Sequence, residues 1–82
     1  MTREEFSNLN LHDKGDVLFQ RGEYTSTRKY YNQNLALYRL FDFWVEVFIM
    51  DGDNPKITEI RVLSDEKALK LYTDGIDLND LI

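Results

Sequence analysis

The sequence contains no cysteine, and this absence excludes several kinds of chemistry. Without thiols, the 82-residue chain forms no disulfide, no cysteine-ligated zinc or iron–sulfur site and no thiol nucleophile. No apolar run approaches the roughly 18 residues that span a bilayer. Residues 1–5 are polar and acidic, so we expect no signal peptide and no membrane association. The composition is typical of a cytoplasmic protein.

Histidine and glycine are also scarce, which limits the catalytic sites that the chain can build. His12 is the only imidazole, and nothing in the spacing places it beside the hydroxyl of Ser7, Ser26 or Ser64. The four glycines are isolated from one another, so no glycine-rich phosphate loop is indicated. We therefore expect no enzymatic activity and no cofactor.

Acidic residues gather in two places without the spacing of a metal site. Residues 51–54 carry oxygen ligands, but a calcium loop also needs a bidentate Glu about twelve positions from its first ligand. Lys56 stands in the middle of that span, and Glu59 is too near its start. We interpret this segment as a polar loop and expect no metal site in the chain. The acidic residues near the C-terminus are too few to hold a cation and are interpreted as a solvated tail: Asp74, Asp77 and Asp80.

Acidic side chains outnumber basic ones by 15 to 10, which gives a formal net charge of -5. Residues 1–41 carry six basic and five acidic side chains, whereas residues 42–82 carry four and ten. Nucleic-acid binding depends mainly on neutralising phosphates with a basic surface, so this balance disfavours it. The only basic stretch, which offers at most a small patch, contains Arg21, Arg28, Lys29 and Arg39.

Two helical segments are predicted within residues 2–21. Thr2 and Glu5 have the spacing of a capping box, in which each side chain accepts a hydrogen bond from the other residue's backbone. Phe6 and Leu9 then share one face of the first helix. After a break, Asp13 is expected to cap the second helix.

The second helix directs two apolar residues, Val17 and Leu18, toward the core and ends at Arg21 and Gly22. Gly15 weakens this helix by about 1 kcal/mol relative to Ala. A strand over residues 17–20 is the alternative interpretation of this segment.

After Gly22 the spacing of the residues no longer has a helical period, and four strands are predicted. Thr and Tyr dominate the first, which we interpret as a polar edge strand, and residues 32–34 supply turn chemistry after it. Ser64 caps a final helix, and the tail that follows has enough apolar residues to pack. The predicted ranges are strands at 24–31, 35–40, 43–50 and 56–63, a helix at 64–72 and a packed acidic tail at 73–82.

Consecutive strands joined by short loops predict an antiparallel meander, and helices at both ends of the sequence place the chain in the α+β class. A two-residue turn at Phe41–Asp42 fixes the register of the central hairpin, because it pairs Leu40 with Phe43. Pairing Met50 with Ile57 extends this register to the last strand. One sheet face then forms the core: Ala36, Tyr38, Leu40, Phe43, Val45, Val47, Ile49, Ile60 and Val62.

The opposite face is too apolar for a solvated surface, although it contains charged residues. Glu46 lies opposite Arg61 and is expected to form an ion pair with it, worth about 0.2–1 kcal/mol. Arg39 is expected to lie over the ring of Trp44. The whole face comprises Leu35, Leu37, Arg39, Trp44, Glu46, Phe48, Met50, Ile57, Glu59, Arg61 and Leu63.

Three interpretations of this second face stay open. The terminal helices cover it by splitting across the sheet, or a partner protein or second copy covers it, or it holds a small molecule. The leading hypothesis is a non-enzymatic protein-interaction module, which in one form is a homodimer. Its candidate residues are Leu35, Leu37, Arg39, Trp44, Phe48 and Arg61.

A second hypothesis places a weak site for a ligand or single-stranded nucleic acid on the strand at 24–31. Basic and aromatic side chains occur together there, as in stacking platforms for single strands. The same strand at a sheet edge could instead accept a peptide by strand addition. The candidate residues are Tyr24, Arg28, Lys29, Tyr30 and Tyr31.

Overall fold

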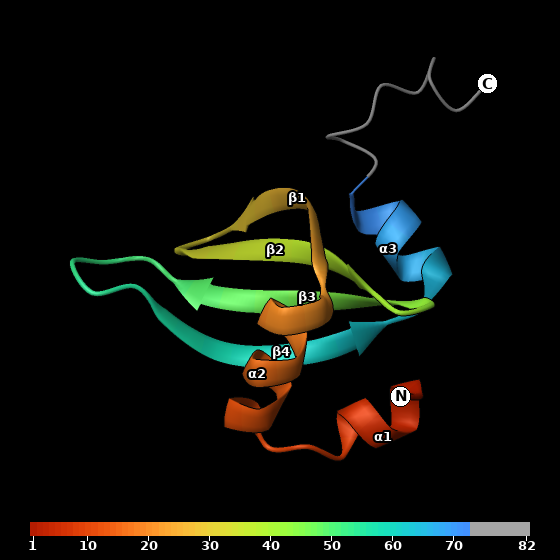
Figure 1. The fold of residues 1–82 in the computed structure, drawn as a ribbon. Coiled ribbons are helices and arrows are strands. Elements are labelled where there is room, and N and C mark those ends of the chain that lie inside the picture. Colours follow the sequence, from red (N-terminus) through yellow and green to blue (C-terminus); the bar gives the residue numbers. More distant parts are fainter. Residues whose placement is uncertain (73–82) are drawn as a thin grey trace.

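A computed structural model describes residues 1–72 and confirms the α+β fold with one four-stranded antiparallel sheet. The strands follow one another in space in the order β1-β2-β3-β4 (Figure 1). The predicted tail at 73–82 lies outside the described residues. The elements are α1 (Arg3–Ser7), α2 (Leu11–Arg21), β1 (Glu23–Tyr30), β2 (Gln33–Leu40), β3 (Phe43–Met50), β4 (Lys56–Leu63) and α3 (Asp65–Leu71).

The caps of the first two helices explain where each begins. The capping box of α1 is present, with the Thr2 backbone N–H donating to Glu5 Oε1 over 2.9 Å and the Glu5 N–H donating to Thr2 Oγ1 over 3.1 Å. The prediction of Asp13 as the cap of α2 was wrong. The Asn10 side chain accepts from the Asp13 backbone N–H over 2.8 Å, so α2 begins three residues earlier. Residues 17–20 are helical and not a strand.

Two tight turns connect the first three strands. The turn predicted at Phe41–Asp42 is present, and it pairs Leu40 with Phe43. The first turn lies at Tyr31–Asn32 rather than at residues 32–34, and β2 therefore begins at Gln33. Tyr31 and Phe41 have φ angles of 56° and 54°, a left-handed conformation that disfavours side chains with a β-carbon. Sheet pairing on both sides holds these residues in place.

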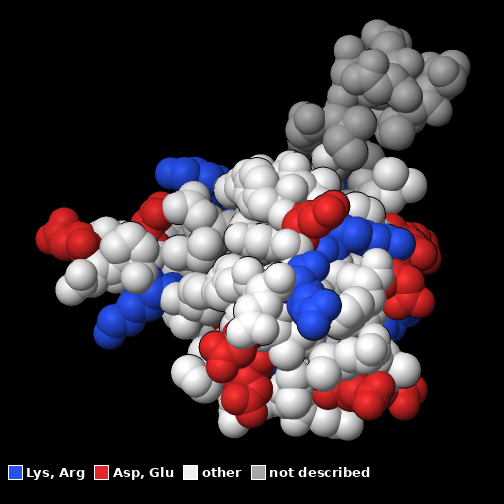
Figure 2. Space-filling model, in the orientation of Figure 1, with Lys and Arg blue, Asp and Glu red and all other residues white. Residues whose placement is uncertain are grey.

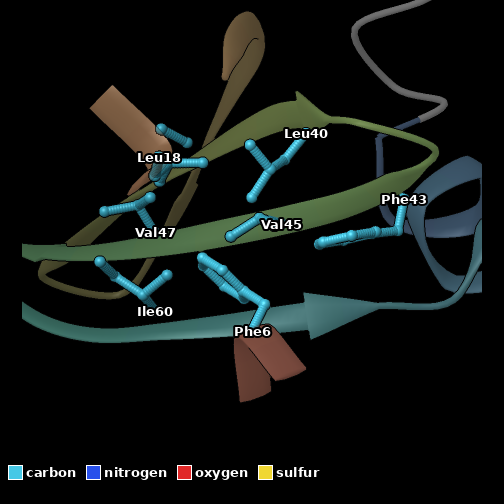
Figure 3. Packing of buried hydrophobic residues seen from close by; sticks show 8 residues of the cluster. Phe6, Leu18, Leu40, Phe43, Val45, Val47 and Ile60 are labelled. Atoms are coloured by element: carbon cyan, nitrogen blue, oxygen red, sulfur yellow. The ribbon is translucent and has the colours of Figure 1, made fainter. Parts of the chain in front are cut away.

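The predicted core face is confirmed, and α1 and α2 cover it. In Figure 1, α2 crosses in front of the sheet and α1 lies beyond β4. Phe6 from α1 and Leu18 from α2 are fully buried against the sheet, and the Phe6 and Phe43 ring centroids lie 5.9 Å apart (Figure 3). Lys14 Nζ also donates to the Ile60 carbonyl oxygen over 3.1 Å, which ties α2 to the edge strand. The sheet residues of this core are Ala36, Leu40, Phe43, Val45, Val47 and Ile60, with Tyr38, Ile49 and Val62 packed beside them.

The predicted pairing of β3 with β4 is correct except at its outer end. Val47 pairs with Ile60 and Val45 with Val62, as expected. The register then shifts between Phe48 and Ile49, because β4 contains a bulge. The bulge pairs Ile57 with Ile49, a residue of the core face, and the prediction that Ile57 pairs with Met50 was wrong.

The second sheet face is covered in part by α3, so the terminal helices lie on opposite sides of the sheet. The Ser64 hydroxyl caps α3 by accepting from the Lys67 backbone N–H over 3.1 Å. Ala68 and Tyr72 are 3% and 2% exposed and pack on the second face. The sheet residues beneath them are Leu37 and Leu63, with Trp44 packed against this cluster.

Candidate functional site

Two hollows flank α3 on the second face of the sheet. The larger, about 630 Å³ in volume, we call the α3 groove. Its floor contains Leu35, Phe48 and Leu63, and Leu71 of α3 forms part of its wall. Tyr30 and the basic residues described below complete its rim. The smaller hollow, of about 370 Å³, is mainly apolar and is lined by Leu37, Trp44, Asp65, Ala68, Leu69, Tyr72, Thr25 and Ser26.

Basic side chains predominate along the α3 groove. Four of its described lining residues are basic, and Glu46 is the only acidic one among them. The Arg61 guanidinium lies 4.7 Å above the centre of the Phe48 ring, which leaves a cation at the level of the apolar floor. The four basic residues come from both edge strands and from α3: Arg28, Arg61, Lys67 and Lys70.

Glu46 is buried beneath α3, where two partners compensate its charge. Its carboxylate lies 3.3 Å from Arg28 Nη2, and the Arg28 Nε–H also donates to Oε2 over 3.3 Å. The Tyr72 hydroxyl donates a hydrogen bond to the same oxygen. The prediction of a Glu46–Arg61 ion pair was wrong, although the two residues do face each other across the strands. Arg61 pairs with Glu59 over 3.0 Å instead, and Arg28 reaches Glu46 from β1 across β2.

Burial raises the pKa of Tyr72 well above its usual value of about 10, and the hydrogen bond to the Glu46 carboxylate raises it further. The positive charge of Arg28, whose guanidinium lies 5.4 Å from the centre of the Tyr72 ring, opposes this increase in pKa. Among residues 1–72, no buried side-chain nitrogen or oxygen lacks a hydrogen-bond partner. The arrangement of Glu46, Arg28 and Tyr72 therefore fixes α3 on the sheet.

The first turn of α3 carries a cation where helix chemistry favours an acid. Lys67 occupies the third helical position, and its backbone N–H is bonded to the cap residue Ser64. In a complete capping box this position is Glu or Gln, as Glu5 is in α1. The positive end of the helix dipole also disfavours a Lys there. Neither helix capping nor the helix dipole therefore favours Lys67.

The structure divides the residues of the predicted interaction face between the two hollows. Leu35, Phe48 and Arg61 line the α3 groove, whereas Leu37 and Trp44 line the smaller hollow. Leu35 and Leu37 are only 1% and 3% exposed and contribute floor rather than open surface.

The predicted contact between Arg39 and Trp44 is present on the same face. The Arg39 guanidinium lies 4.7 Å above the Trp44 ring centre, and Arg39 Nη1 lies 3.8 Å from an Asp65 carboxylate oxygen of α3. This stacked pair borders the smaller hollow, so the hollow is built from sheet and helix together.

The residues of the predicted polar site do not gather in one place. Arg28 and Tyr30 line the α3 groove. Tyr24 pairs with Tyr38 and Lys29 with Asn34, which puts both on the core side of the sheet, and Lys29 lies 3.6 Å from Asp51. Tyr31 lies in the turn and makes an edge-to-face contact with Tyr30, with ring centres 4.6 Å apart.

The contribution of α3 to the groove was missed by sequence reasoning. Lys67, Lys70 and Leu71 have spacings of three and four residues, which place them on adjoining parts of one helix face. This pattern could have indicated a cationic helix face beside an apolar sheet. The prediction of a partner surface rested on the strands alone.

A possible metal site lies away from the groove, at the start of α2. Ligand atoms of His12, Asp13 and Asp16 lie within 4.8 Å of one another, and His12 Nε2 is 3.4 Å from an Asp16 carboxylate oxygen. All three side chains are exposed. Exposed acidic groups of this kind are common without an ion, and the cluster carries no further argument.

The side of the molecule seen in Figure 2 carries acidic and basic residues in separate small groups rather than one basic patch. None of the helices within residues 1–72 has the length and apolar character needed to cross a membrane. Comparison of the chain with protein-family models, with curated proteins and with solved structures gives no match. The case for a function therefore rests on the geometry of the groove.

Proposed function

We propose that the protein is a non-enzymatic interaction module that binds a segment of another protein in the α3 groove. The observation that carries the proposal is the groove itself, which combines an apolar floor with a basic rim. Its volume of about 630 Å³ can receive several side chains of a partner. The proposed location is the cytoplasm, as the composition suggests.

The chemistry of the groove supports a protein partner. Aromatic and arginine side chains are enriched at protein interfaces and contribute much of their binding energy. Tyr30, Phe48, Arg28 and Arg61 supply this chemistry around a floor that already contains buried leucines. The core face, in contrast, is covered by α1 and α2.

The experiment is a selection of random peptides displayed on phage against the immobilised full-length protein. Clones that bind are then measured against Phe48→Asp, which places a charge on the groove floor. The control is Phe19→Asp, which introduces the same charge at an exposed phenylalanine of α2 on the core side of the sheet. We expect a set of peptides that lose binding to Phe48→Asp and keep it with Phe19→Asp.

A second groove variant separates loss of binding from loss of folding. Leu71 is 37% exposed on the groove wall, and Leu71→Asn removes apolar surface there without entering the sheet. Circular dichroism should show that each variant keeps its fold. The proposal is wrong if the folded variants bind every selected peptide as the wild type does, or if no peptide is selected.

The alternative function, binding of single-stranded nucleic acid, is tested on the same proteins. A short single-stranded DNA is titrated against wild type and against Lys29→Gln, a change at an exposed residue of the predicted polar site, by fluorescence anisotropy at low salt. DNA binding that depends on Lys29 but is unchanged in Phe48→Asp would replace the proposal. We expect flat anisotropy, because the chain carries an excess of acidic residues.

A further inference from the structure

We infer that the partner segment is acidic and carries aliphatic or aromatic side chains, an inference that rests on the function proposed above. The groove has two chemical parts, and each selects one feature of its occupant. Leu35, Phe48 and Leu63 form an apolar floor. Basic residues from β1, β4 and α3 stand around this floor.

The distribution of charge supports an acidic occupant. The protein carries a net charge of -5, yet four of its ten basic residues line this one groove. The single acidic lining residue, Glu46, is 1% exposed and is compensated by Arg28 and Tyr72. Arg28 is paired with Glu46 and Arg61 with Glu59, but basic side chains still outnumber these two acidic partners at the groove, which favours carboxylates and disfavours a basic segment.

Lys67 contributes to the basic rim from the first turn of α3. A Glu at this position would complete the capping box with Ser64 and would suit the helix dipole. The chain instead places a cation there, on the side of α3 that lines the groove. Lys67 therefore adds positive charge to the rim at a position where it does not help the helix.

A second lysine of α3, Lys70, lies on the same side of the helix as Lys67. Lys67 and Lys70 are three residues apart and therefore lie on one helix face, directly beside the apolar Leu71. Arg61 faces them from β4, above the Phe48 ring. An occupant that alternates acidic and apolar residues would meet both the rim and the floor.

The test uses two synthetic fluorescein-labelled peptides and the full-length protein. In the first peptide Asp alternates with Leu, and in the second Asn replaces each Asp. We expect the acidic peptide to bind at least about tenfold more tightly than the amide peptide, and its affinity to fall as salt is added. Equal affinity for both peptides would overturn the inference. If the Phe48→Asp variant then bound neither peptide, the proposed function would still be supported.

Charge reversal at one position tests the rim without loss of folding. Lys67→Glu is expected to weaken binding of the acidic peptide about tenfold or more and to leave the affinity for the amide peptide unchanged. The matched control is Arg3→Glu, which makes the same charge change in the first turn of α1, on the other side of the sheet. Equal weakening by both variants would mean that only net charge matters, and would contradict the inference.

Other occupants of the groove give distinct outcomes. A dimer in native mass spectrometry that disappears in Lys67→Glu would assign the groove to a second copy. Tighter binding of the acidic peptide after Asp74, Asp77 and Asp80 are changed to Asn would assign it to the chain's own C-terminal residues. Either result would overturn the inference, whereas a monomer with unchanged affinity supports it.

Discussion

Gly15 within α2 and Gly22 at its end differ in the space that surrounds them. A β-carbon added at Gly15 would lie 3.8 Å from a Phe19 ring carbon and 3.9 Å from Ile60 Cδ1, both ordinary contacts. A β-carbon added at Gly22 would lie 2.6 Å from the Leu18 carbonyl oxygen and 2.9 Å from Leu18 Cδ1. The first site has space for a methyl group and the second does not.

We therefore predict opposite effects of alanine at the two sites. Gly15→Ala should raise the free energy of unfolding by about 0.5–1 kcal/mol, because Ala restricts the unfolded chain and favours the helix. Gly22→Ala should lower it by about 1–3 kcal/mol, because Leu18 must move. Urea unfolding followed by circular dichroism measures both changes. Two shifts in the same direction would contradict the packing described here.

Glu46 shows how far residue-level prediction from the sequence reaches. The predicted pairing of β3 with β4 correctly placed Glu46 opposite Arg61, because the bulge that shifts the register lies nearer the outer end of these strands, between Phe48 and Ile49. It did not reveal the partner of Glu46, because Arg28 belongs to a strand that is not adjacent to β3 and Tyr72 follows a helix. Such contacts depend on side-chain reach across the sheet, and the local pattern does not encode them.

At the scale of elements, α3 depends on its cap and on the sheet for its stability. A seven-residue helix is unstable alone in water, so its contacts must hold it in place. The Ser64 hydroxyl satisfies one backbone donor at its start, while Ala68 and Tyr72 bury its inner face. The groove has a wall only while these contacts persist.

Substitutions in the first turn of α3 should change stability in opposite directions. Lys67→Glu is predicted to raise the free energy of unfolding by about 0.3–1 kcal/mol, because it removes a cation from the positive end of the helix and supplies the missing part of the capping box. Ser64→Ala is predicted to lower it by about 0.5–2 kcal/mol. Thermal unfolding of both variants checks this. A destabilised Lys67→Glu would mean that Lys67 stabilises α3 through other contacts.

Most elements were predictable from the sequence, and the errors have local causes. The predicted bounds of β3 and β4 matched, because the polar loop at 51–55 separates two segments that are rich in β-branched and aromatic residues. The start of α2 was missed because Asn10 and Asp13 are both good caps and the pattern does not separate them. The turn at Tyr31–Asn32 contains no glycine, and its residue with a left-handed conformation is a tyrosine. The amino-acid composition therefore favoured a turn at residues 32–34 instead.

At the scale of the whole molecule, the raised pKa of Tyr72 makes stability depend on alkaline pH. The pKa of Tyr72 in the folded protein lies above the value of about 10 expected in the unfolded chain. The contribution of this residue to stability is therefore fully present below about pH 10 and is lost as the pH rises through the folded-state pKa. The unfolded state releases the proton first, so alkali favours unfolding.

Tyr72→Phe should remove this dependence. The variant is expected to lose about 1–3 kcal/mol at neutral pH, because the hydrogen bond to the Glu46 carboxylate is absent. Its disadvantage relative to wild type should then shrink as the pH rises from about 8 to about 11. Urea unfolding across this range measures the difference, with Tyr30→Phe as the exposed control. A difference that stays constant with pH would contradict this account.

The division of the molecule into two faces was predictable, but the division of the second face was not. The core residues followed from alternation, and α1 and α2 supplied the apolar residues that cover them. The sequence left open what covers the other face. What covers that face depends on the direction that α3 takes after Ser64. Because α3 is short, it covers only part of the face, with the α3 groove on one side and the smaller hollow on the other.

The contact of the first two helices with the last strand has a consequence during synthesis. All sheet neighbours are consecutive in the chain, but Lys14 of α2 meets Ile60 of β4, 46 residues later. At about 5–20 residues per second, a ribosome needs roughly 2–9 s to make this stretch. For that interval Phe6 and Leu18 lack part of the surface that buries them. The nascent chain therefore exposes its helical apolar side chains until β4 emerges, and a slow codon in that stretch would lengthen the exposure.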